Sequence, residues 1–203
     1  GVPIVARGAG TGLSGGALPD DAGVLLVLAR MQKVLEVNPA GRTARVEPGV
    51  RNVVISEQAA APGLHYAPDP SSQIACSIGG NVAENSGGVH CLKYGLTVHN
   101  ALGVKLVTAD GELIELGGAA LDGPGLDLLT VINGSEGLLG IIVEVTVRLL
   151  PIPESARVVM ASFDDVAAAG NAVATVIAAG ILPAGMELMD RLALTAAEAF
   201  AQA

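Results

Sequence analysis

Glycine is concentrated in the run ARGAGTGLSGGAL, residues 6–18, where it stands at positions 8, 10, 12, 15 and 16 beside apolar segments. Because glycine lacks a Cβ atom, it adopts positive φ angles and lets a ligand approach the main-chain N–H groups directly. Many glycine-rich loops are simple turns, but this density favours a loop that wraps a phosphate group. No lysine follows these glycines, which excludes the phosphate-binding loop of nucleotide triphosphatases.

The same run contains a GxGxxG match at Gly10, Gly12 and Gly15, with Glu36 further along the chain. This dinucleotide-binding fingerprint requires its last glycine to open a helix whose N-terminus meets the pyrophosphate. Here a proline and two aspartates follow, and then a strand-like segment, so no helix of useful length fits. We therefore predict a glycine nest between two strands, with the amides of residues 8–16 pointing at an anion.

Two further segments combine glycine with small polar side chains. The first, PDPSSQIACSIGGNVAENSGG over residues 68–88, offers hydroxyls, amides and two Gly-Gly pairs that suit hydrogen bonding to a polar, planar ligand. Its Ser77 fits equally well as the N-cap of a helix. The second, NGSEGLLGIIVEV over residues 133–145, fits a bulge or tight connection as well as a ligand contact. Three such segments in a chain with 2% aromatic residues indicate a large ligand that brings its own apolar surface.

The composition excludes several classes of partner. With a net charge of −9 and no basic cluster, the chain lacks the Lys and Arg patches that nucleic acid or an anionic membrane surface requires. No apolar run approaches the roughly 20 residues of a membrane helix, and no signal-peptide pattern is present, so we expect a soluble, cytosolic type of protein without membrane insertion. The two cysteines cannot form a zinc site alone, and we expect His65, His90 and His99 to be packing or surface residues rather than metal ligands.

Hydrophobic patterning predicts short strands and helices in the first 150 residues. They are strands over 24–29, 33–37 and 44–46, a helix over 50–61, a short helix after Ser77 that ends at the Gly-Gly pair 87–88, and a hairpin of 102–108 with 113–116 turned by an Asp-Gly pair. In a further strand over 141–149, the odd-numbered positions are apolar and alternate with Glu144, Thr146 and Arg148. This alternation predicts one buried face and one wet face.

Pro151 and Pro153 mark the predicted boundary between two domains, residues 1–150 and 151–203. Beyond the boundary we predict a βαβα unit. Its elements are a strand over 156–163, a helix over 166–179 capped by Asp164 and stopped by Gly180, a strand over 186–189 and a helix after Asp190.

The motifs RGAGTGLSGG, PDPSSQIACSIGGNVAENSGG, KYG (residues 93–95) and GSEGLLGIIVEVTV, in this order over nearly the whole chain, resemble the FAD-linked oxidases of the vanillyl-alcohol oxidase superfamily. Within it they are most similar to the family of glycolate oxidase FAD subunits and D-lactate dehydrogenases. The resemblance implies an α+β fold, with a PCMH-type FAD-binding domain of two subdomains over residues 1–150 and the start of a ferredoxin-like α+β cap over residues 151–203. It also implies a strand and a helix before the segment 1–7, and a large cap after Asp190 that holds most of the substrate-binding and catalytic groups.

The resemblance further implies a role for each motif toward FAD. The first loop would bind the pyrophosphate, the second segment the flavin ring and ribityl chain, and the third the adenine end. The residues concerned are Arg7, Gly8, Ala9, Gly10, Thr11, Gly12, Leu13, Ser14, Gly15, Gly16, Pro68, Asp69, Ser72, Cys76, Ser77, Gly79, Gly80, Asn81, Asn85, Gly87, Gly88, Tyr94, Glu136, Gly140 and Ile142. Family members that bind FAD covalently carry a histidine about where Thr11 stands, or a cysteine in the second segment. Cys76 lies near the place of that cysteine but is offset from it by one residue. We therefore expect FAD to be bound non-covalently.

The implied activity is oxidation of a short 2-hydroxy acid, glycolate or D-lactate, to the 2-oxo acid by hydride transfer to N5 of FAD. An alternative is an FAD-holding subunit of a glycolate oxidase complex that is inactive without its partner chains, a second flavin subunit and an iron–sulfur subunit. A UDP-sugar reductase of related fold is a further, weaker alternative. No Arg/His cluster suits a substrate carboxylate, so we assign no catalytic residue and expect the base in the cap. The resemblance implies a cytoplasmic location, or peripheral attachment to the inner face of the membrane through partner subunits.

Overall fold

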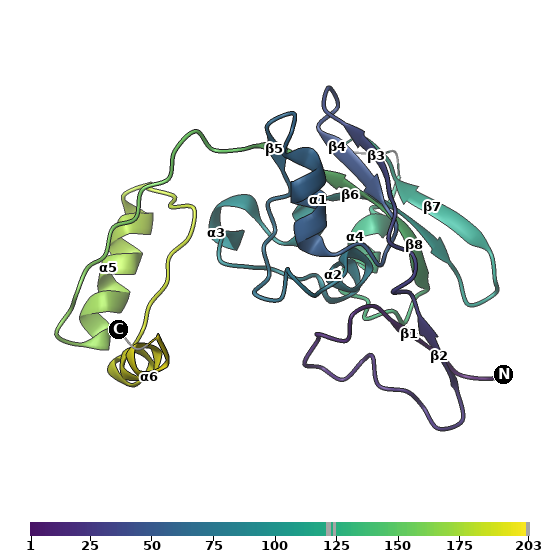
Figure 1. Cartoon of the computed structure of the whole chain (residues 1–203), viewed down its shortest axis with the longest axis horizontal. Helices are drawn as coiled ribbons and strands as arrows, with labels where there is room; N and C mark the ends of the chain where they lie inside the picture. The colour runs from purple at the N-terminus through teal and green to yellow at the C-terminus, as the bar shows by residue number, and fades with distance from the viewer. Residues whose placement is uncertain (121–122, 124, 202–203) are drawn as a thin grey trace.

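The computed structural model describes residues 1–120, 123 and 125–201 (Figure 1). Its centre is an antiparallel five-stranded sheet in the order β3-β4-β8-β6-β7. The strands are β3 (Val34–Asn38), β4 (Thr43–Val46), β6 (Ala101–Val107), β7 (Leu113–Gly117) and β8 (Ile141–Arg148). The predicted hairpin is confirmed as β6 and β7, with Gly111 at φ +82° in its turn.

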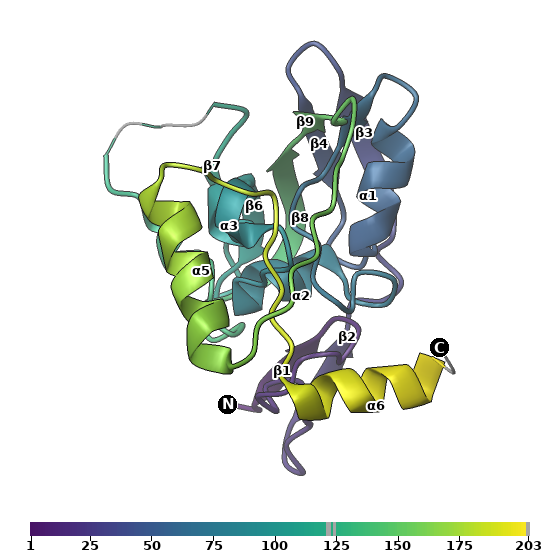
Figure 2. The same cartoon turned by 90° about the vertical axis from the view of Figure 1, so that its left-hand side faces the viewer.

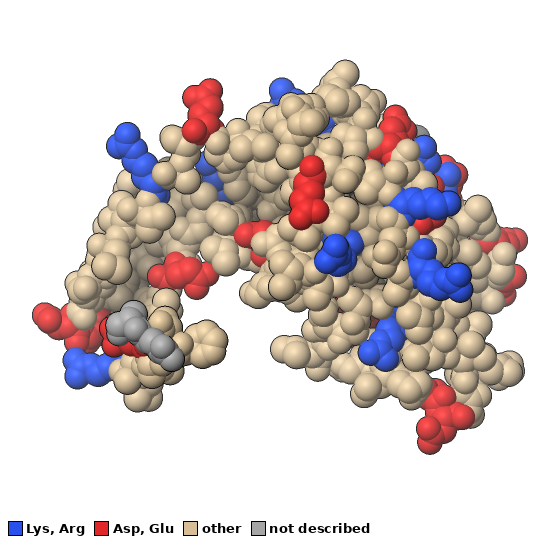
Figure 3. All heavy atoms as spheres, in the orientation of Figure 1, with Lys and Arg blue, Asp and Glu red and all other residues tan. Residues whose placement is uncertain are grey.

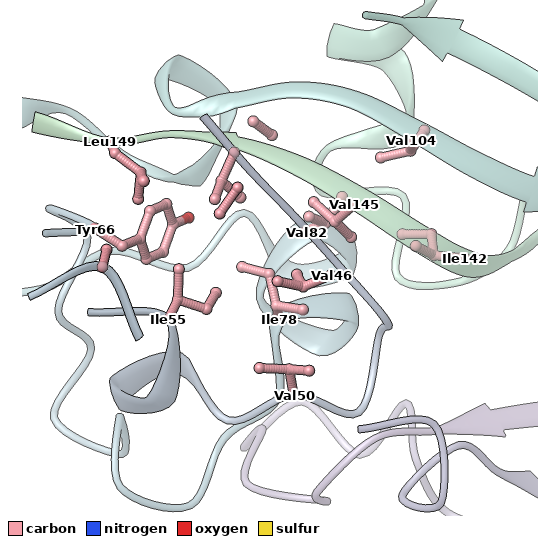
Figure 4. Packing of buried hydrophobic residues seen from close by; sticks show 14 of the residues in the cluster. Val46, Val50, Ile55, Tyr66, Ile78, Val82, Val104, Ile142, Val145 and Leu149 are labelled. Atoms are coloured by element: carbon pink, nitrogen blue, oxygen red, sulfur yellow. The ribbon is translucent and has the colours of Figure 1, made fainter. Parts of the chain in front are cut away.

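Helices cover one face of this sheet. They are α1 (Asn52–Ala59), α2 (Ile78–Glu84) and α4 (Leu128–Ile132), of which α4 was not predicted. The buried cluster joins Val46 and Val145 of the sheet to Ile55 of α1 and to Ile78 and Val82 of α2 (Figure 4). Helices packed on one side of an antiparallel sheet define the α+β class that the sequence predicts.

The opposite face of the sheet carries a row of charges that crosses all five strands. Arg45 on β4 pairs with Glu36 on β3 at 3.4 Å and with Glu144 on β8 at 3.3 Å. Lys105 on β6 reaches Glu144 at 3.6 Å and Glu115 on β7 at 3.0 Å. The hydrogen bond to Glu144, and then its charge, raise the pKa of Arg45. Alternation along β4 places this arginine between Ala44 and Val46, which point into the core.

Strand β8 departs from the strict alternation that its sequence predicts. The apolar odd-numbered residues from Val145 onward are buried, as predicted, but at the start of the strand Ile142 is buried and Val143 only partly so. The cause is a bulge in the ladder with β6, where the neighbours Lys105 and Leu106 pair with residues that lie two apart on β8. One extra residue in a strand reverses which side chains face the core on either side of it.

A separate pair of strands carries the first glycine-rich loop. β1 (Ile4–Arg7) and β2 (Val24–Val27) pair in parallel and lie outside the five-stranded sheet (Figure 1). Residues 8–23 between them form turns and bends without a helix. The helix that a dinucleotide-binding fingerprint requires is therefore absent from this loop, as predicted.

After β8 the chain leaves the sheet. β9 (Leu150–Pro151) pairs with β5 (Leu64–His65). The helices α5 (Val166–Ala178) and α6 (Arg191–Ala201) stand apart from the sheet in Figure 1 and lie in front of the rest of the chain in Figure 2. The end of α5 before Gly180, which has φ +75°, confirms the prediction. The predicted cap is wrong by one residue, because Asp165 and not Asp164 accepts the N–H of Ala168, at 2.7 Å.

Two predicted strands, 156–163 and 186–189, are wrong. Neither segment pairs with another described strand, and Val158, Val159 and Met160 are 95%, 91% and 93% exposed. Branched apolar residues suit a strand only where a neighbouring strand receives its hydrogen bonds and side chains. Residues 121, 122 and 124 of the first predicted domain and 202–203 of the second lie outside the described residues.

On the face drawn in Figure 3, the Lys and Arg side chains are scattered among acidic and uncharged residues rather than gathered into one patch. In the described part of the chain, no helix combines the length and the apolar character needed to cross a membrane.

Candidate functional site

The first glycine-rich loop lies against the start of α2. A Cβ atom on Gly8 would overlap the hydroxyl of Ser77, the residue that precedes α2. A Cβ atom on Gly10, which has φ +69°, would lie 2.8 Å from a guanidinium nitrogen of Arg7. Glycine at position 8 therefore permits the close approach of the loop to the helix, and glycine at position 10 leaves room for the side chain of Arg7.

Ser77 holds the N-cap position of α2 but makes no capping hydrogen bond. Its backbone is extended, as at other N-caps, while its Oγ is buried and has no hydrogen-bond partner in the protein. Leaving a buried hydroxyl unpaired is unfavourable, and this residue borders a cavity. The sequence left two interpretations of Ser77 open, an N-cap and a ligand contact. Its backbone occupies the N-cap position, while its unpaired hydroxyl is suited to a hydrogen bond with a ligand.

Helix α2 ends earlier than predicted. Its last residue is Glu84, because Asn85 takes the left-handed conformation with φ +50° and stops the helix before the Gly-Gly pair 87–88. The Oδ1 atom of Asn85 accepts the N–H of Val98 at 2.9 Å. Asn85 thus serves as the helix end and as a link to the next segment.

A buried amide pair anchors α2 to α1. The Nδ2 atom of Asn81 donates to Oδ1 of Asn52 at 2.9 Å, and Nδ2 of Asn52 donates to the carbonyl of Pro68 at 2.8 Å. Both side chains are buried. Asn52 was not predicted as a site residue, and its only sequence signal is an amide in the first turn of a largely apolar helix. It fixes the orientation of Asn81, which borders the cavity.

The third glycine-rich segment closes on the other end of α2. The N–H of Gly134 donates to the carbonyl of Val82 at 2.9 Å, and the N–H of Glu136 donates to the carbonyl of Ala83 at 2.8 Å. These carbonyls belong to the last turn of the helix, where carbonyls lack the usual intrahelical partner; that of Val82 also accepts the N–H of the C-cap residue Asn85, at 3.2 Å. All three predicted segments are therefore held on one short helix.

A cavity of about 290 Å³ lies where the three segments meet. The predicted residues that line it are Arg7, Gly8, Ala9, Gly10, Thr11, Gly12, Leu13, Gly16, Ser72, Cys76, Ser77, Gly79, Gly80, Asn81, Glu136, Gly140 and Ile142. The residues that also line it but were not predicted are Ala6, Ala17, Leu28, Pro48, Ala83, Glu84, Ser86 and Gly137. Glu84 follows Asn81 by three residues, a spacing that places both on one side of a helix, so this signal was available.

The other predicted residues do not line the cavity. They are Ser14, Gly15, Pro68, Asp69, Asn85, Gly87, Gly88 and Tyr94. Several form a second cluster: a Cβ atom on Gly88 would overlap the main chain of Asp69, and Oδ2 of Asp69 lies 2.6 Å from Nδ1 of His90. The ring of Tyr94, in the short helix α3 (Cys91–Tyr94), lies 6.4 Å from that imidazole. The expectation that His90 is an ordinary packing or surface residue overlooked this pairing, and contact between the cluster and a ligand stays a prediction.

The groups around the cavity suit a cofactor that is part anion and part polyol. Arg7 provides a cation, the loop provides unhindered backbone, and Ser77 provides a buried donor without a protein partner. Leu28 and Ile142 add apolar wall. The volume stands at the low end of the roughly 300–1,000 Å³ of ligand pockets, so the cavity accommodates part of a molecule as large as a flavin dinucleotide.

Comparison with known proteins identifies the class. Residues 1–117 match the family described as FAD binding domain, and residues 152–203 match the family described as FAD linked oxidases, C-terminal domain. The chain belongs to the FAD-linked oxidases that carry this FAD-binding domain, and FAD is its cofactor. The predicted family and fold class are confirmed.

Individual relatives narrow the comparison. Glycolate oxidase subunit GlcD of Escherichia coli is 64% identical over 202 residues, which are 100% of this chain and 40% of that protein. The subunit of the same name from Bacillus subtilis is 42% identical, over 99% of this chain and 43% of its own length. D-lactate dehydrogenase of Archaeoglobus fulgidus is 37% identical, over 97% of this chain and 44% of its own length. The solved structure of an alkyldihydroxyacetonephosphate synthase superposes with a TM-score of 0.76 at 27% identity, covering 91% of this chain and 34% of that one. The chain thus spans less than half the length of these relatives.

Proposed function

We propose that the protein containing this chain is an FAD-dependent dehydrogenase that oxidises a short 2-hydroxy acid, glycolate or D-lactate, to the 2-oxo acid. The observation that carries the proposal is the meeting of three glycine-rich segments around one cavity, in a chain whose relatives include a glycolate oxidase subunit and a D-lactate dehydrogenase. When bound, FAD supplies the hydride acceptor. The residues of this chain bind and orient it.

The binding residues act in different ways. Arg7 offers a planar, permanently charged group that suits a diphosphate, and glycine at position 10 leaves room for that guanidinium. Ser77 offers a donor whose hydrogen bond is not used by the protein. Asn81, held by Asn52 at 2.9 Å, presents a fixed amide at the cavity wall. These groups position the cofactor, and none is proposed to move a proton.

The groups that handle the substrate are proposed to come from elsewhere in the protein. Among the described residues lining the cavity, Arg7 is the one cation and there is no histidine. A 2-hydroxy acid needs a cation for its carboxylate and a base for its hydroxyl proton. We place both in the cap domain that begins after residue 150, and the division into residues 1–150 and 151–203 remains part of this proposal.

Anaerobic addition of substrate tests the activity. Glycolate or D-lactate is added to the full-length, FAD-loaded protein, and bleaching of the visible flavin band is recorded. Bleaching by either acid supports the proposal. A flavin that stays oxidised with both acids, but is reduced once partner chains are added, supports the second candidate, an FAD-holding subunit. That candidate is favoured by the word subunit in the names of two relatives.

The partners are proposed as a second flavin subunit and an iron–sulfur subunit, with any membrane attachment made through them. Purification of the tagged full-length protein from its own cells tests this assembly. Co-purification of an iron–sulfur protein supports it, and a tagged protein that elutes alone in both soluble and membrane fractions contradicts it.

We propose that FAD is bound without a covalent link. Thr11 and Cys76 both line the cavity, and they stand near the positions at which covalent attachment would be expected. Acid precipitation of the holoprotein tests the bond. Yellow colour that leaves with the supernatant supports dissociable FAD, and yellow colour that stays in the washed pellet contradicts it.

A further inference from the structure

Two opposite charges face the same glycine-rich loop from different elements. The guanidinium of Arg7 lies 2.8 Å from the position of a Cβ atom on Gly10. The carboxylate of Glu84 lies 3.5 Å from the corresponding position on Gly12 and 3.9 Å from that on Gly16. Neither charge forms an ion pair with another described residue. Both line the cavity, so both are available to a ligand.

The glycine-rich loop runs along α2, so that different parts of the loop lie against opposite ends of the helix. Its start, at Gly8, lies against Ser77 at the N-terminal end of the helix, while Gly12 and Gly16 lie against Glu84 at the C-terminal end. Seven residues of helix correspond to about 10 Å along the axis. The loop therefore has one end next to an unpaired buried hydroxyl and another end next to a carboxylate.

A diphosphate cannot occupy both ends equally well. A phosphate beside the Glu84 carboxylate would suffer like-charge repulsion, whereas beside Arg7 and the Ser77 hydroxyl it gains charge-assisted hydrogen bonds. A carboxylate can only accept hydrogen bonds. The neutral donors of a flavin dinucleotide are its sugar hydroxyls, the N3–H of the flavin ring and the amino group of adenine. Of these, the sugar hydroxyls lie nearest to the diphosphate, and acidic side chains bind such hydroxyls in other dinucleotide sites.

We propose that the loop is divided by charge: Arg7 and Ser77 hold the diphosphate of FAD, and the Glu84 carboxylate accepts hydrogen bonds from sugar hydroxyls of the same cofactor. This inference rests on the proposed function only in taking FAD as the occupant. It narrows the predicted pyrophosphate site from residues 8–16 to the first part of that loop, and it gives a role to a cavity residue that the sequence did not single out.

Binding measurements on the full-length apoprotein test the inference. FAD and FMN are each titrated while quenching of flavin fluorescence is followed, for the wild type, Glu84→Ala and Glu84→Gln. Glu57→Gln is the matched control, because Glu57 is an exposed carboxylate on α1 that does not line the cavity. We expect Glu84→Ala to weaken FAD binding about tenfold, Glu84→Gln to weaken it less, and Glu57→Gln to leave it unchanged.

The two ligands distinguish the sources of the hydroxyls. A loss shared by FMN places them in the ribityl chain, and a loss confined to FAD places them in the ribose of the adenosine half. Both results support the inference. FAD binding that is unchanged or tighter in both Glu84 variants overturns it, because a carboxylate that only repels phosphate would improve binding when removed.

Arg7→Gln provides the second arm. It should weaken FAD binding and flatten the dependence of the dissociation constant on salt concentration, because the charge that is screened has been removed. An unchanged salt dependence would overturn the placement of the diphosphate. All of these titrations are made without substrate, so failure of the inference is distinct from failure of the proposed 2-hydroxy acid oxidation. Urea unfolding of each apoprotein confirms that the variants are folded.

Discussion

Alanine at position 8 would place a methyl group on the hydroxyl of Ser77, well inside the separation at which carbon and oxygen normally meet. The next nearest atoms to that methyl group are Cβ of Ser77 at 3.6 Å and the amide nitrogen of Gly80 at 3.8 Å, which are ordinary contacts. The whole conflict is therefore with one oxygen atom. Overpacking of this kind costs about 1–3 kcal/mol. Because Ser77→Ala removes that oxygen, the double variant Gly8→Ala/Ser77→Ala should recover most of the loss.

Ser77→Ala alone should change two properties in opposite directions. In the apoprotein it removes a buried hydroxyl without a partner, so the free energy of unfolding should stay the same or rise by about 1 kcal/mol. In the complex one hydrogen bond to FAD is lost, which should weaken binding about fivefold. Urea unfolding of the four apoproteins gives the coupling between the two sites, and fluorescence titration gives the affinity. Additive effects on unfolding would show that the two residues do not touch in solution, and an unchanged affinity would show that Ser77 does not donate to the cofactor.

Other parts of the structure give three further predictions. Asn52→Ala should lower the free energy of unfolding by about 2–3 kcal/mol, measured by urea unfolding, because it leaves two buried polar groups unpaired; a loss below about 0.5 kcal/mol, the range of ordinary surface substitutions, would contradict the buried network. Glu144→Gln should lower it by about 1 kcal/mol at low salt, and by less in about 1 M salt, because it weakens the pair with Arg45; a loss that salt does not reduce would point to packing instead. Hydrogen bonds from the hydroxyl and then the N–H of Thr130 hold the pKa of Asp127 below its usual 3.8, so the stability from this N-cap of α4 is present above that value and is lost as the pH falls through the lowered pKa. The acid unfolding curve of Asp127→Asn should lack this component, and an unchanged curve would refute it.

Elements with a signal inside their own sequence were predicted well. The hairpin follows from its Asp-Gly turn, where Gly111 has φ +82°, and α5 follows from its run of alanine before Gly180. The strand predicted over 156–163 has the same kind of local signal but fails, because a strand also requires a partner that its own residues do not encode. The bulge in β8 likewise depends on β6 and cannot be read from the alternation of β8 alone.

The residues of the candidate site show the same contrast between local sequence signals and contacts that arise only on folding. The glycine-rich segments could be recognised as cavity residues from the sequence alone. A backbone that another group approaches closely requires glycine, whichever part of the chain or ligand that group belongs to. The contacts of Asn52 and His90 were missed because each depends on a residue brought near by folding, whereas Glu84 could have been found from its spacing to Asn81. The pair of Asn52 with Asn81 spans 29 positions, and the pair of His90 with Asp69 spans 21. A single amide or imidazole in the sequence carries no signal of such a distant partner.

Helix α2 links cofactor binding to folding. The helix and its N-cap residue Ser77 meet the first loop through Ser77 and Glu84. The helix also holds the third loop through the carbonyls of Val82 and Ala83, and it buries the side chain of Val82 under the sheet. A ligand that contacts all three segments therefore contacts groups whose positions depend on one packed helix. Such a ligand binds the folded chain and not the unfolded one. It therefore raises the free energy of unfolding, and at concentrations well above the dissociation constant this rise grows with the logarithm of the ratio of ligand concentration to dissociation constant. Weakened FAD binding in any of the cavity variants should accordingly appear as a smaller rise in stability when FAD is added, even where the stability of the apoprotein is unchanged.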